Sequence, residues 1–333
     1  MGITIKELSE ISGFSTATIS RVISKQGNVK EETKIAIEKL LIEHNYRSNI
    51  LDLKKSEFSR RTIMIIVGDL DNWYYMESIR AVNHHLLEKG YVPIIGFSNN
   101  EIELEEKYVQ VALQENYAGI AFINVRGNDN LQKILERNDC PVVFLNREIK
   151  LASFDAVCSD NYHGGYMATS YLIEMGHKKI GHLMGSIYSN TASERRRGYE
   201  DAMRNRGLVV TENSVYHGDL DWKSGYKFGE ILIQKGLDYT AIFSSGYQMA
   251  EGLLRALSDY GVKVPEDISI VTFDSTPATK KENLTTACAE PEKIGKTAVE
   301  LLVKRIEGET REAQKVYFES KILVGASVRK LME

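Results

Sequence analysis

The chain has 333 residues, of which 43% are hydrophobic and 26% are charged, and its formal net charge is −4. This length suggests two or three domains, and no apolar run approaches the roughly 18 residues of a membrane span. The N-terminus has no basic stretch leading into an apolar one, and Cys140, Cys158 and Cys288 are odd in number and widely spaced. We therefore expect a cytoplasmic protein with reduced thiols, without a secretory signal, membrane segment or metal site.

The first residues predict two short helices. Thr4 and Glu7 have the spacing of a capping box, in which each side chain satisfies a free backbone N–H at a helix start. Gly13 ends this helix, and Ser15 can cap a second one. Two helices joined by a glycine-containing turn form a helix-turn-helix, which places its second helix in a DNA major groove. A plain packing hairpin is the alternative.

The remainder of the head is expected to be a third helix over 31–45. In the first two helices, the predicted apolar faces contain Leu8 with Ile11, and Ile19 with Val22 and Ile23. In the third helix, the residues predicted to point mainly inward are Ile35, Leu40, Leu41 and Ile42. The segment up to residue 61 contains 11 Lys and Arg against 8 Asp and Glu, whereas the rest contains 31 against 38. A basic head on an acidic body favours contact with a polyanion, but a solvated surface with chance asymmetry also fits.

At Ile63 the pattern changes to alternating strands and helices. The run 63–67 is continuously apolar, as in a parallel strand buried on both faces. Further strands are predicted over 92–95, 119–123, 142–145, 180–183, 241–244 and 268–273, and helices over 77–89, 103–115, 166–175, 195–206 and 247–260. We expect doubly wound parallel sheets in two α/β subdomains, with the ligand in the cleft between them.

No catalytic constellation is found in the sequence. There is no nucleophile elbow, no Walker-type phosphate loop and no His/Cys spacing suited to zinc. Gly164-Gly165 lacks the Lys and Ser/Thr that a phosphate loop needs, and His84-His85 and His182 are most simply surface or packing residues. We expect neither enzymatic activity nor a cofactor.

The sequence resembles the LacI/GalR family of bacterial repressors in both parts. The head carries Ile3-Thr4-Ile5-Lys6-Glu7-Leu8 and Ser15-Thr16-Ala17-Thr18-Ile19-Ser20-Arg21-Val22. The body carries 71–75 (DNWYY), 143–147 (VFLNR), 172–177 (LIEMGH), 264–269 (VPEDIS) and Phe273-Asp274. This likeness covers nearly the whole chain and implies a helix-turn-helix head with a body like a periplasmic sugar-binding protein.

The resemblance also implies domain boundaries. The DNA-binding domain is expected over 1–47, a hinge over 48–61 and the effector-binding and dimerisation domain over 62–333. The N-subdomain would comprise about 62–160 and 291–320, and the C-subdomain about 161–290 and 321–333. The chain would cross between them near Asp160, Glu290 and Lys321.

In this family, the second helix reads the operator. Thr16 and Ala17 would face base edges and Arg21 would reach a base or phosphate, with backbone contacts from other residues of the head and linker. The residues implied in DNA binding are Thr4, Ser15, Thr16, Ala17, Thr18, Ser20, Arg21, Asn28, Asn49, Leu53, Lys54 and Lys55.

The resemblance also implies an effector site. Arg195 would reach sugar hydroxyls or a carboxylate, with an interlobe salt bridge as the structural alternative. Asp274 would accept hydroxyl protons, or else cap the following segment. Tyr74 and Tyr75 would stack on a pyranose, although without the family we would interpret them as core residues. The full implied set is Tyr74, Tyr75, Asn124, Arg147, Asp160, Arg195, Leu220, Tyr247 and Asp274.

Several positions depart from the family pattern. Gly246-Tyr247 replaces a usual Asn-Asp pair, Trp73 replaces a proline, and Leu220 stands where an aromatic ring often stacks on ligand. In the hinge, Lys55 falls where the family inserts a leucine into the minor groove, so we expect weaker operator bending. The effector's identity therefore cannot be copied from a relative.

The expected function is a homodimeric repressor of a carbohydrate operon. It would bind a pseudo-palindromic operator, and a sugar or sugar phosphate in the cleft would change operator affinity by allostery. The same fold responding to a purine, another non-sugar ligand or a corepressor protein is the alternative. A secreted sugar-binding protein and a sugar-modifying enzyme fit less well.

Overall fold

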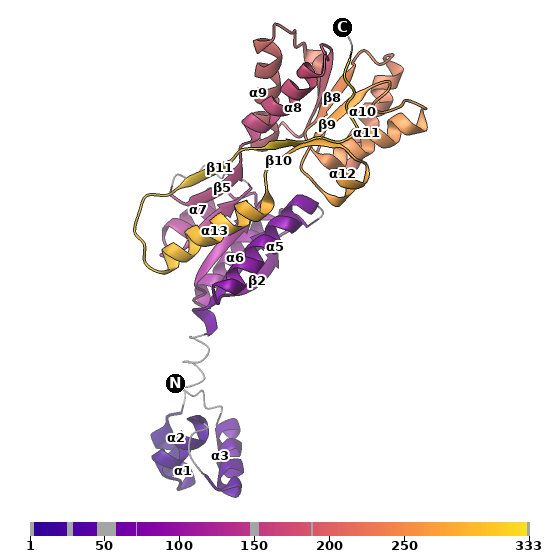
Figure 1. Ribbon diagram of the computed structural model, residues 1–333. Helices are drawn as coiled ribbons and strands as arrows, with labels where there is room; N and C mark the ends of the chain where they lie inside the picture. Colours follow the sequence, from indigo (N-terminus) through magenta and orange to yellow (C-terminus); the bar gives the residue numbers. More distant parts are fainter. Residues whose placement is uncertain are drawn as a thin grey trace.

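The computed structural model describes residues 3–24, 29–44, 58–70, 72–146, 153–187 and 189–331. These residues form a helical head and two α/β lobes, each built on one sheet (Figure 1). The predicted fold class is thus confirmed. Six of the predicted site residues lie outside the described residues, namely Asn28, Asn49, Leu53, Lys54, Lys55 and Arg147.

The head consists of α1 (Ile5–Ser12), α2 (Thr16–Ser24) and α3 (Glu31–Glu43). The predicted capping box is present: the Glu7 backbone N–H donates to Thr4 Oγ1 at 3.3 Å, and the Thr4 N–H donates to Glu7 Oε2 at 2.7 Å. Gly13 follows α1 with a left-handed φ of 73°, which a glycine adopts without strain. Ser15 Oγ accepts the Thr18 N–H at 3.1 Å and so caps α2.

The head has its own small core. Its buried side chains are Leu8, Ile19, Val22 and Ile37, with Leu40 and Leu41 partly buried against them. The expected inward position of Ile35 is wrong, because Ile35 is 52% exposed and Ile37 is buried instead. Ile37 shares a helix face with residues three and four positions later, whereas a two-residue offset puts Ile35 on the opposite side.

Ile11 is also exposed, contrary to its expected place beside Leu8. The less exposed positions of α1 are Ile5, Leu8, Ser9 and Ser12, which form a stripe at spacings of three and four. Ile11 lies outside this stripe. The side chain of Ile42 is not among those that the structure describes.

The first lobe, here called the N-lobe, is a six-stranded parallel sheet in the order β11-β5-β4-β3-β1-β2. Its strands are β1 (Thr62–Val67), β2 (Val92–Phe97), β3 (Gly119–Ile123), β4 (Val142–Leu145), β5 (Asp155–Ser159) and β11 (Lys315–Phe318). Helices α5 (Trp73–Glu88) and α13 (Pro291–Ile306) cover one face, and α6 (Ile102–Gln114) and α7 (Asp129–Glu136) cover the other. The four inner strands are buried throughout, as the apolar runs predict.

The second lobe, the C-lobe, repeats this architecture in the order β12-β10-β9-β8-β6-β7. Its strands are β6 (Ile180–Met184), β7 (Val215–His217), β8 (Ala241–Ser244), β9 (Ser269–Phe273), β10 (Thr285–Cys288) and β12 (Lys321–Leu323), of which β12 pairs antiparallel. Helices α8 (Asn161–Glu174) and α9 (Asn190–Asn205) cover one face, and α10 (Trp222–Gln234) and α11 (Tyr247–Asp259) the other. A 3₁₀ turn (Glu212–Ser214) and α12 (Pro277–Lys281) complete the lobe.

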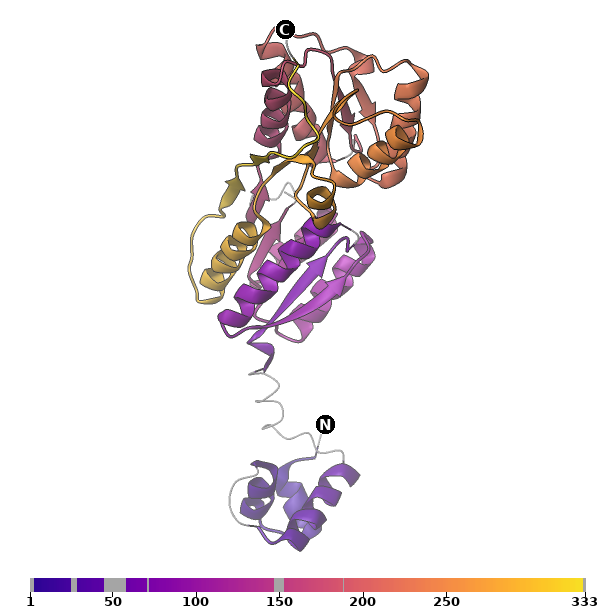
Figure 2. The same ribbon diagram turned by 45° about the vertical axis from the view of Figure 1, so that its right-hand side comes forward.

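The chain passes between the lobes three times. It leaves the N-lobe after β5, returns after β10 into α13, and crosses again between β11 and β12 (Figure 2). As a result, the carboxyl ends of both parallel sheets face each other across the connection. Among the described residues, no helix is long and apolar enough to span a membrane.

The contrast between Ile37 and Ile35 gives a matched test of the head. Ile37→Ala is expected to destabilise the head by about 2–5 kcal/mol, because it removes buried methylenes and leaves a cavity. Ile35→Ala is expected to change stability by less than about 0.5 kcal/mol. Hydrogen exchange of peptides from α1, α2 and α3 in the full-length chain measures both. Equal acceleration in the two variants would contradict the observed packing of α3.

Candidate functional site

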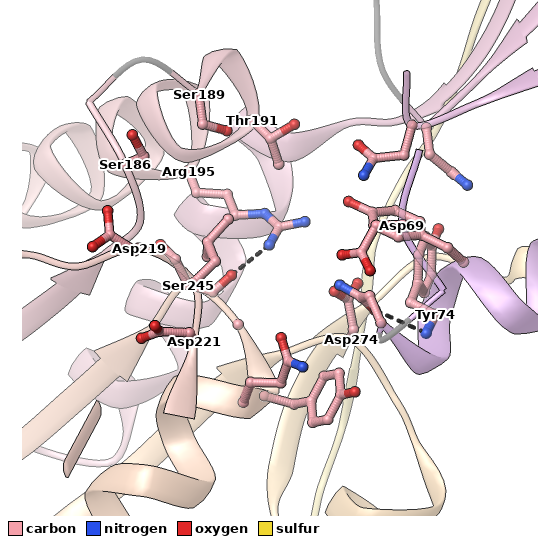
Figure 3. Close-up of a pocket in the computed structure, with 18 of the residues that line it drawn as sticks. Asp69, Tyr74, Ser186, Ser189, Thr191, Arg195, Asp219, Asp221, Ser245 and Asp274 are labelled. Carbon is pink, nitrogen blue, oxygen red and sulfur yellow. Dashed lines mark hydrogen bonds between the residues drawn. The ribbon is translucent and has the colours of Figure 1, made fainter. Parts of the chain in front are cut away.

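A cleft with a volume of about 640 Å³ lies between the lobes and is lined by residues of both (Figure 3). Seven of the nine side chains implied in effector binding line it, namely Tyr74, Tyr75, Asn124, Arg195, Leu220, Tyr247 and Asp274. Of the other two, Arg147 lies outside the described residues. Asp160 lines a smaller neighbouring cavity of about 390 Å³, where its carboxylate caps α8 by accepting the His163 N–H at 2.8 Å.

Left-handed residues at the ends of parallel strands shape the cleft. Asn124 follows β3 with φ 51°, Asn146 follows β4 with φ 62°, and Asp274 follows β9 with φ 71°. Asn and Asp tolerate this conformation better than other non-glycine residues. Each strand therefore ends in a sharp turn that presents an amide or carboxylate to the cleft.

Leu220 has the same left-handed backbone, with φ 63°, but without the side chain that favours it. Its side chain packs against the backbone of Gly185 and Gly246, where a Cβ at Gly185 would lie 2.6 Å from Leu220 Cγ. Packing thus holds a strained residue at the cleft wall. Backbone strain of this kind clusters at active sites and ligand-binding sites.

Arg195 projects from α9 into the cleft and is 7% exposed (Figure 3). Its Nε donates to Asn161 Oδ1 at 2.9 Å, its Nη1 donates to the Ser245 carbonyl, and its guanidinium lies 3.5 Å from the centroid of the Phe273 ring. Gly165 lets α8 approach this point, because a Cβ there would lie 2.2 Å from the Arg195 carbonyl oxygen. All these partners belong to the C-lobe, so these contacts do not form the interlobe salt bridge considered as the alternative.

Asp274 is 6% exposed, and its Oδ1 has no hydrogen-bond partner among the residues that the structure describes. Burial raises the pKa of its carboxyl, and Arg195 opposes this shift. Thr276, not Asp274, caps α12 by accepting the Thr279 N–H at 3.1 Å. An unsatisfied acceptor on a residue that lines the cleft is an exception that a bound ligand would explain.

Two tyrosines combine packing with the cleft. Tyr74 is buried, and this burial raises the pKa of its phenol. The phenol oxygen is hydrogen-bonded to Ser159 Oγ at 2.9 Å. Tyr75 lies beside it, with ring centroids 6.0 Å apart, and is less buried. Tyr74 is therefore both a core residue and a wall of the cleft, which joins the two interpretations of the sequence.

Tyr247 makes a contact between the lobes. Its phenol oxygen accepts the backbone N–H of Trp73 at 3.2 Å, from the opposite side of the cleft. Trp73 is the first residue of α5. The N–H groups in the first turn of a helix have no partner within the helix. The adjacent Asn72 side chain accepts the Tyr74 N–H at 2.9 Å. A helix of the N-lobe is thus capped partly from the C-lobe.

The sequence reasoning missed most of the remaining lining. The missed residues are Asp69, Asn72, Asn100, Arg126, Asn146, Ser159, Asn161, Ser186, Ser189, Thr191, Asp219, Asp221, Ser245 and Gln248. Many follow the carboxyl end of a strand, which is the signal that could have found them. The cleft consequently contains four Asp against two Arg, with amides and hydroxyls between them.

In the head, the exposed side of α2 carries the residues implied in operator reading. Thr16, Ala17 and Arg21 are exposed, and Thr18 and Ser20 are half-buried. The hydroxyls of Ser15 and Thr18 bond to each other at 2.8 Å, which holds the start of the helix. Thr4 is likewise engaged in the capping box of α1.

Comparison with known proteins agrees with this architecture. The family described as "Bacterial regulatory proteins, lacI family" matches residues 4–49, and "Periplasmic binding protein-like domain" matches 169–328. The HTH-type transcriptional repressor PurR of Erwinia tasmaniensis is 31% identical over 322 residues, covering 94% of this chain and 93% of the relative. PurR of Proteus mirabilis is 30% identical over 334 residues, covering 98% and 96%.

Solved structures show the same likeness. The complex of the transcriptional regulator CelR with cellobiose superposes with a TM-score of 0.74 at 26% identity, covering 98% of this chain and 99% of that one. The transcription regulator CcpA of Lactococcus lactis superposes with a TM-score of 0.72 at 28% identity, covering 80% and 99%.

The buried carboxyl of Asp274 yields a prediction for the ligand-free protein. Because its pKa is raised on folding, the native state binds more protons between the unfolded value near 3.8 and the folded value. Stability therefore falls as pH rises through this interval. Asp274→Asn is therefore expected to raise the free energy of unfolding at pH 7.

Urea unfolding of the wild type and the variant at neutral and acidic pH measures this difference. Below pH 3.8 the wild-type carboxyl is protonated in both states, so the two proteins should differ little. A variant that is less stable at pH 7 would show that the carboxylate stabilises Arg195 by more than its own burial costs.

Proposed function

The chain belongs to the LacI family of DNA-binding transcriptional repressors, and from this premise we propose that it senses a neutral sugar in the interlobe cleft. It is a transcriptional regulator and not an enzyme. The observation that carries the proposal is a polar cleft in which buried Arg195 and Asp274 face the ligand space from one lobe. Amides from the other lobe, at Asn124 and Asn146, complete it.

The charge of the cleft favours a neutral polyol. Four aspartates outnumber two arginines in the lining, so a phosphate would meet net repulsion. Arg195 offers donors, whereas Oδ1 of Asp274 and Oδ1 of Asn146 are acceptors without a donor among the residues that the structure describes. Vicinal hydroxyls supply both kinds of group within one small molecule. This favours a sugar over a sugar phosphate, which the sequence left open.

A purine is the alternative ligand, given the names of the PurR relatives. A flat base is held best between two aromatic rings. Here Tyr74 and Tyr75 line one side of the cleft, while the C-lobe side has the aliphatic Leu220 and Tyr247, whose phenol is bonded to the Trp73 N–H. The cellobiose in the CelR complex shows that a structure of this fold accommodates a neutral sugar. These points favour the sugar.

Allostery in this proposal operates through the angle between the lobes. A ligand that bonds to Asp274 in one lobe and Asn146 in the other stabilises one lobe arrangement over the rest. The Tyr247–Trp73 hydrogen bond also joins the N-lobe to the C-lobe, and it needs no ligand. We propose that operator affinity follows this arrangement, which makes the cleft and the head two coupled sites.

We further propose that the working unit is a homodimer on a pseudo-palindromic operator. Strand β2 is the edge of the N-lobe sheet (Figure 1) and exposes Val92, Ile95 and Phe97. An edge strand with exposed apolar side chains is a surface that proteins normally cover. A second copy would cover it and bring two heads to adjacent half-sites.

Selection of operator DNA from a random pool, followed by titration with sugars, tests the function. Wild type is expected to select a palindromic site, and a neutral sugar should change its affinity. Asp274→Asn should weaken sugar binding about 10-fold or more, since a hydrogen bond to a charged group contributes about 1.5–3 kcal/mol. Operator affinity without sugar should stay unchanged. Asp259→Asn, a surface substitution on α11, is the control.

Response to sugar phosphates or purine bases, with none to neutral sugars, would contradict the ligand class. Absence of any selected DNA site would contradict the DNA-binding part separately.

The contact between the lobes can be tested without any ligand. Tyr247→Phe removes the hydroxyl that accepts the Trp73 N–H, a bond with a net contribution of about 1 kcal/mol. Hydrogen exchange in the first turn of α5 is therefore expected to accelerate about fivefold. Tyr226→Phe, which removes a phenol bonded to Asp259 on the surface, should leave this segment unchanged. Equal exchange in Tyr247→Phe and wild type would mean that this contact does not hold the lobes.

A further inference from the structure

A group of nitrogen and oxygen ligands lies on α5, away from the cleft. His84, His85 and Glu88 bring three potential ligand atoms within 4.8 Å of one another. The cleft is lined by the opposite end of the same helix, at Asn72 and Tyr75. Ten residues of α-helix separate Tyr75 from His85, which corresponds to about 15 Å. The group is therefore distinct from the effector site.

The distances within the group suit a small metal ion. The carboxylate of Glu88 lies 3.4 Å from Nε2 of His84 and 2.8 Å from Nδ1 of His85. Ligand atoms bound tetrahedrally at about 2.0–2.1 Å from Zn²⁺ are separated by roughly 3.3 Å. Small side-chain rotations would thus place one ion in contact with all three residues.

A fourth residue fixes the orientation of His85. Its Nε2 lies 2.7 Å from Oε1 of Glu292, at the start of α13, and its side chain is only 14% exposed. Helices α5 and α13 pack side by side on the N-lobe sheet (Figures 1 and 2). When Nε2 donates its proton to Glu292, the Nδ1 lone pair faces Glu88 and His84. Second carboxylates commonly orient metal-binding histidines in this way.

We propose that His84, His85 and Glu88 form a binding site for a divalent transition-metal ion, with Zn²⁺ as the best fit and Glu292 as the orienting residue. Two imidazoles and one carboxylate are a known zinc donor set that leaves a fourth position for water. Nitrogen donors select Zn²⁺, Cu²⁺ or Ni²⁺ and disfavour Mg²⁺ and Ca²⁺. The bound ion would tie α5 more firmly to α13 through His85 and Glu292.

One charge nearby opposes the ion. Lys296 lies one turn after Glu292 on α13. The pKa of the Glu88 carboxyl is lowered chiefly by its hydrogen bond with His85 and by His84, and Lys296 makes a smaller contribution. Its ammonium would repel a divalent cation at the same carboxylate. Lys296→Gln is therefore expected to tighten Zn²⁺ binding, a gain that a chance surface contact elsewhere would not show.

Calorimetric titration of the untagged, chelator-stripped full-length chain with ZnCl₂ tests the site. We expect one saturable Zn²⁺ per chain, a Co²⁺ derivative with the visible absorption of tetrahedral nitrogen and oxygen coordination, and no saturable Mg²⁺ binding. His84→Ala and Glu88→Ala should abolish the saturable binding. Glu292→Gln should weaken it about 10- to 100-fold, as orienting partners typically do.

Two controls keep the result interpretable. His217→Ala removes an exposed histidine in the C-lobe and should leave Zn²⁺ binding unchanged. The His84 side chain is 63% exposed, so its replacement should leave the fold intact even if His85→Ala does not fold. Unfolding curves in chelator verify this. Undiminished binding in His84→Ala, or loss of binding in His217→Ala, would overturn the proposal.

Discussion

The two lobes depend on one constraint: the carboxyl ends of the parallel strands in one sheet face those in the other sheet. Three chain crossings impose it, since β5, β10 and β11 each lead out of one lobe into the other. Parallel strands end at one edge, and their loops collect polar side chains there. With both edges opposed, residues that are hundreds of positions apart line one cavity, such as Asp69 and Asp274.

This cavity costs the protein stability. Asp274 and Arg195 are ionisable groups with little exposure. Burial raises the pKa of Asp274 and lowers the pKa of Arg195, so it disfavours the charged form of each. Leu220 adds a left-handed backbone that its side chain does not favour. A buried carboxylate oxygen without a donor has an unfavourable desolvation free energy. A ligand with hydroxyl groups would offset this cost by donating a hydrogen bond. Binding therefore relieves an unfavourable feature of the ligand-free protein, which is a source of affinity.

His182 shows how environment decides the role of a residue. It is fully buried, stacks between Tyr199 and Phe243 at 4.9 and 4.7 Å, and burial lowers its pKa to about 3. It is a neutral packing residue, as the sequence suggested. His84 and His85 were interpreted in the same way, yet a carboxylate from a helix more than 200 residues away orients one of them.

The sequence by itself determined the fold class and many of the elements, because caps, glycine breaks and apolar periodicity act over a few residues. It did not predict β5, β11, α10 or α13. The capping box at Thr4 and the buried strand at Ile63 follow from such local rules. The choice of Ile37 over Ile35, the free oxygen of Asp274 and the Tyr247–Trp73 bond were decided only by the tertiary structure. Burial and long-range partners depend on what the other elements place nearby, and spacing along the chain does not carry that information.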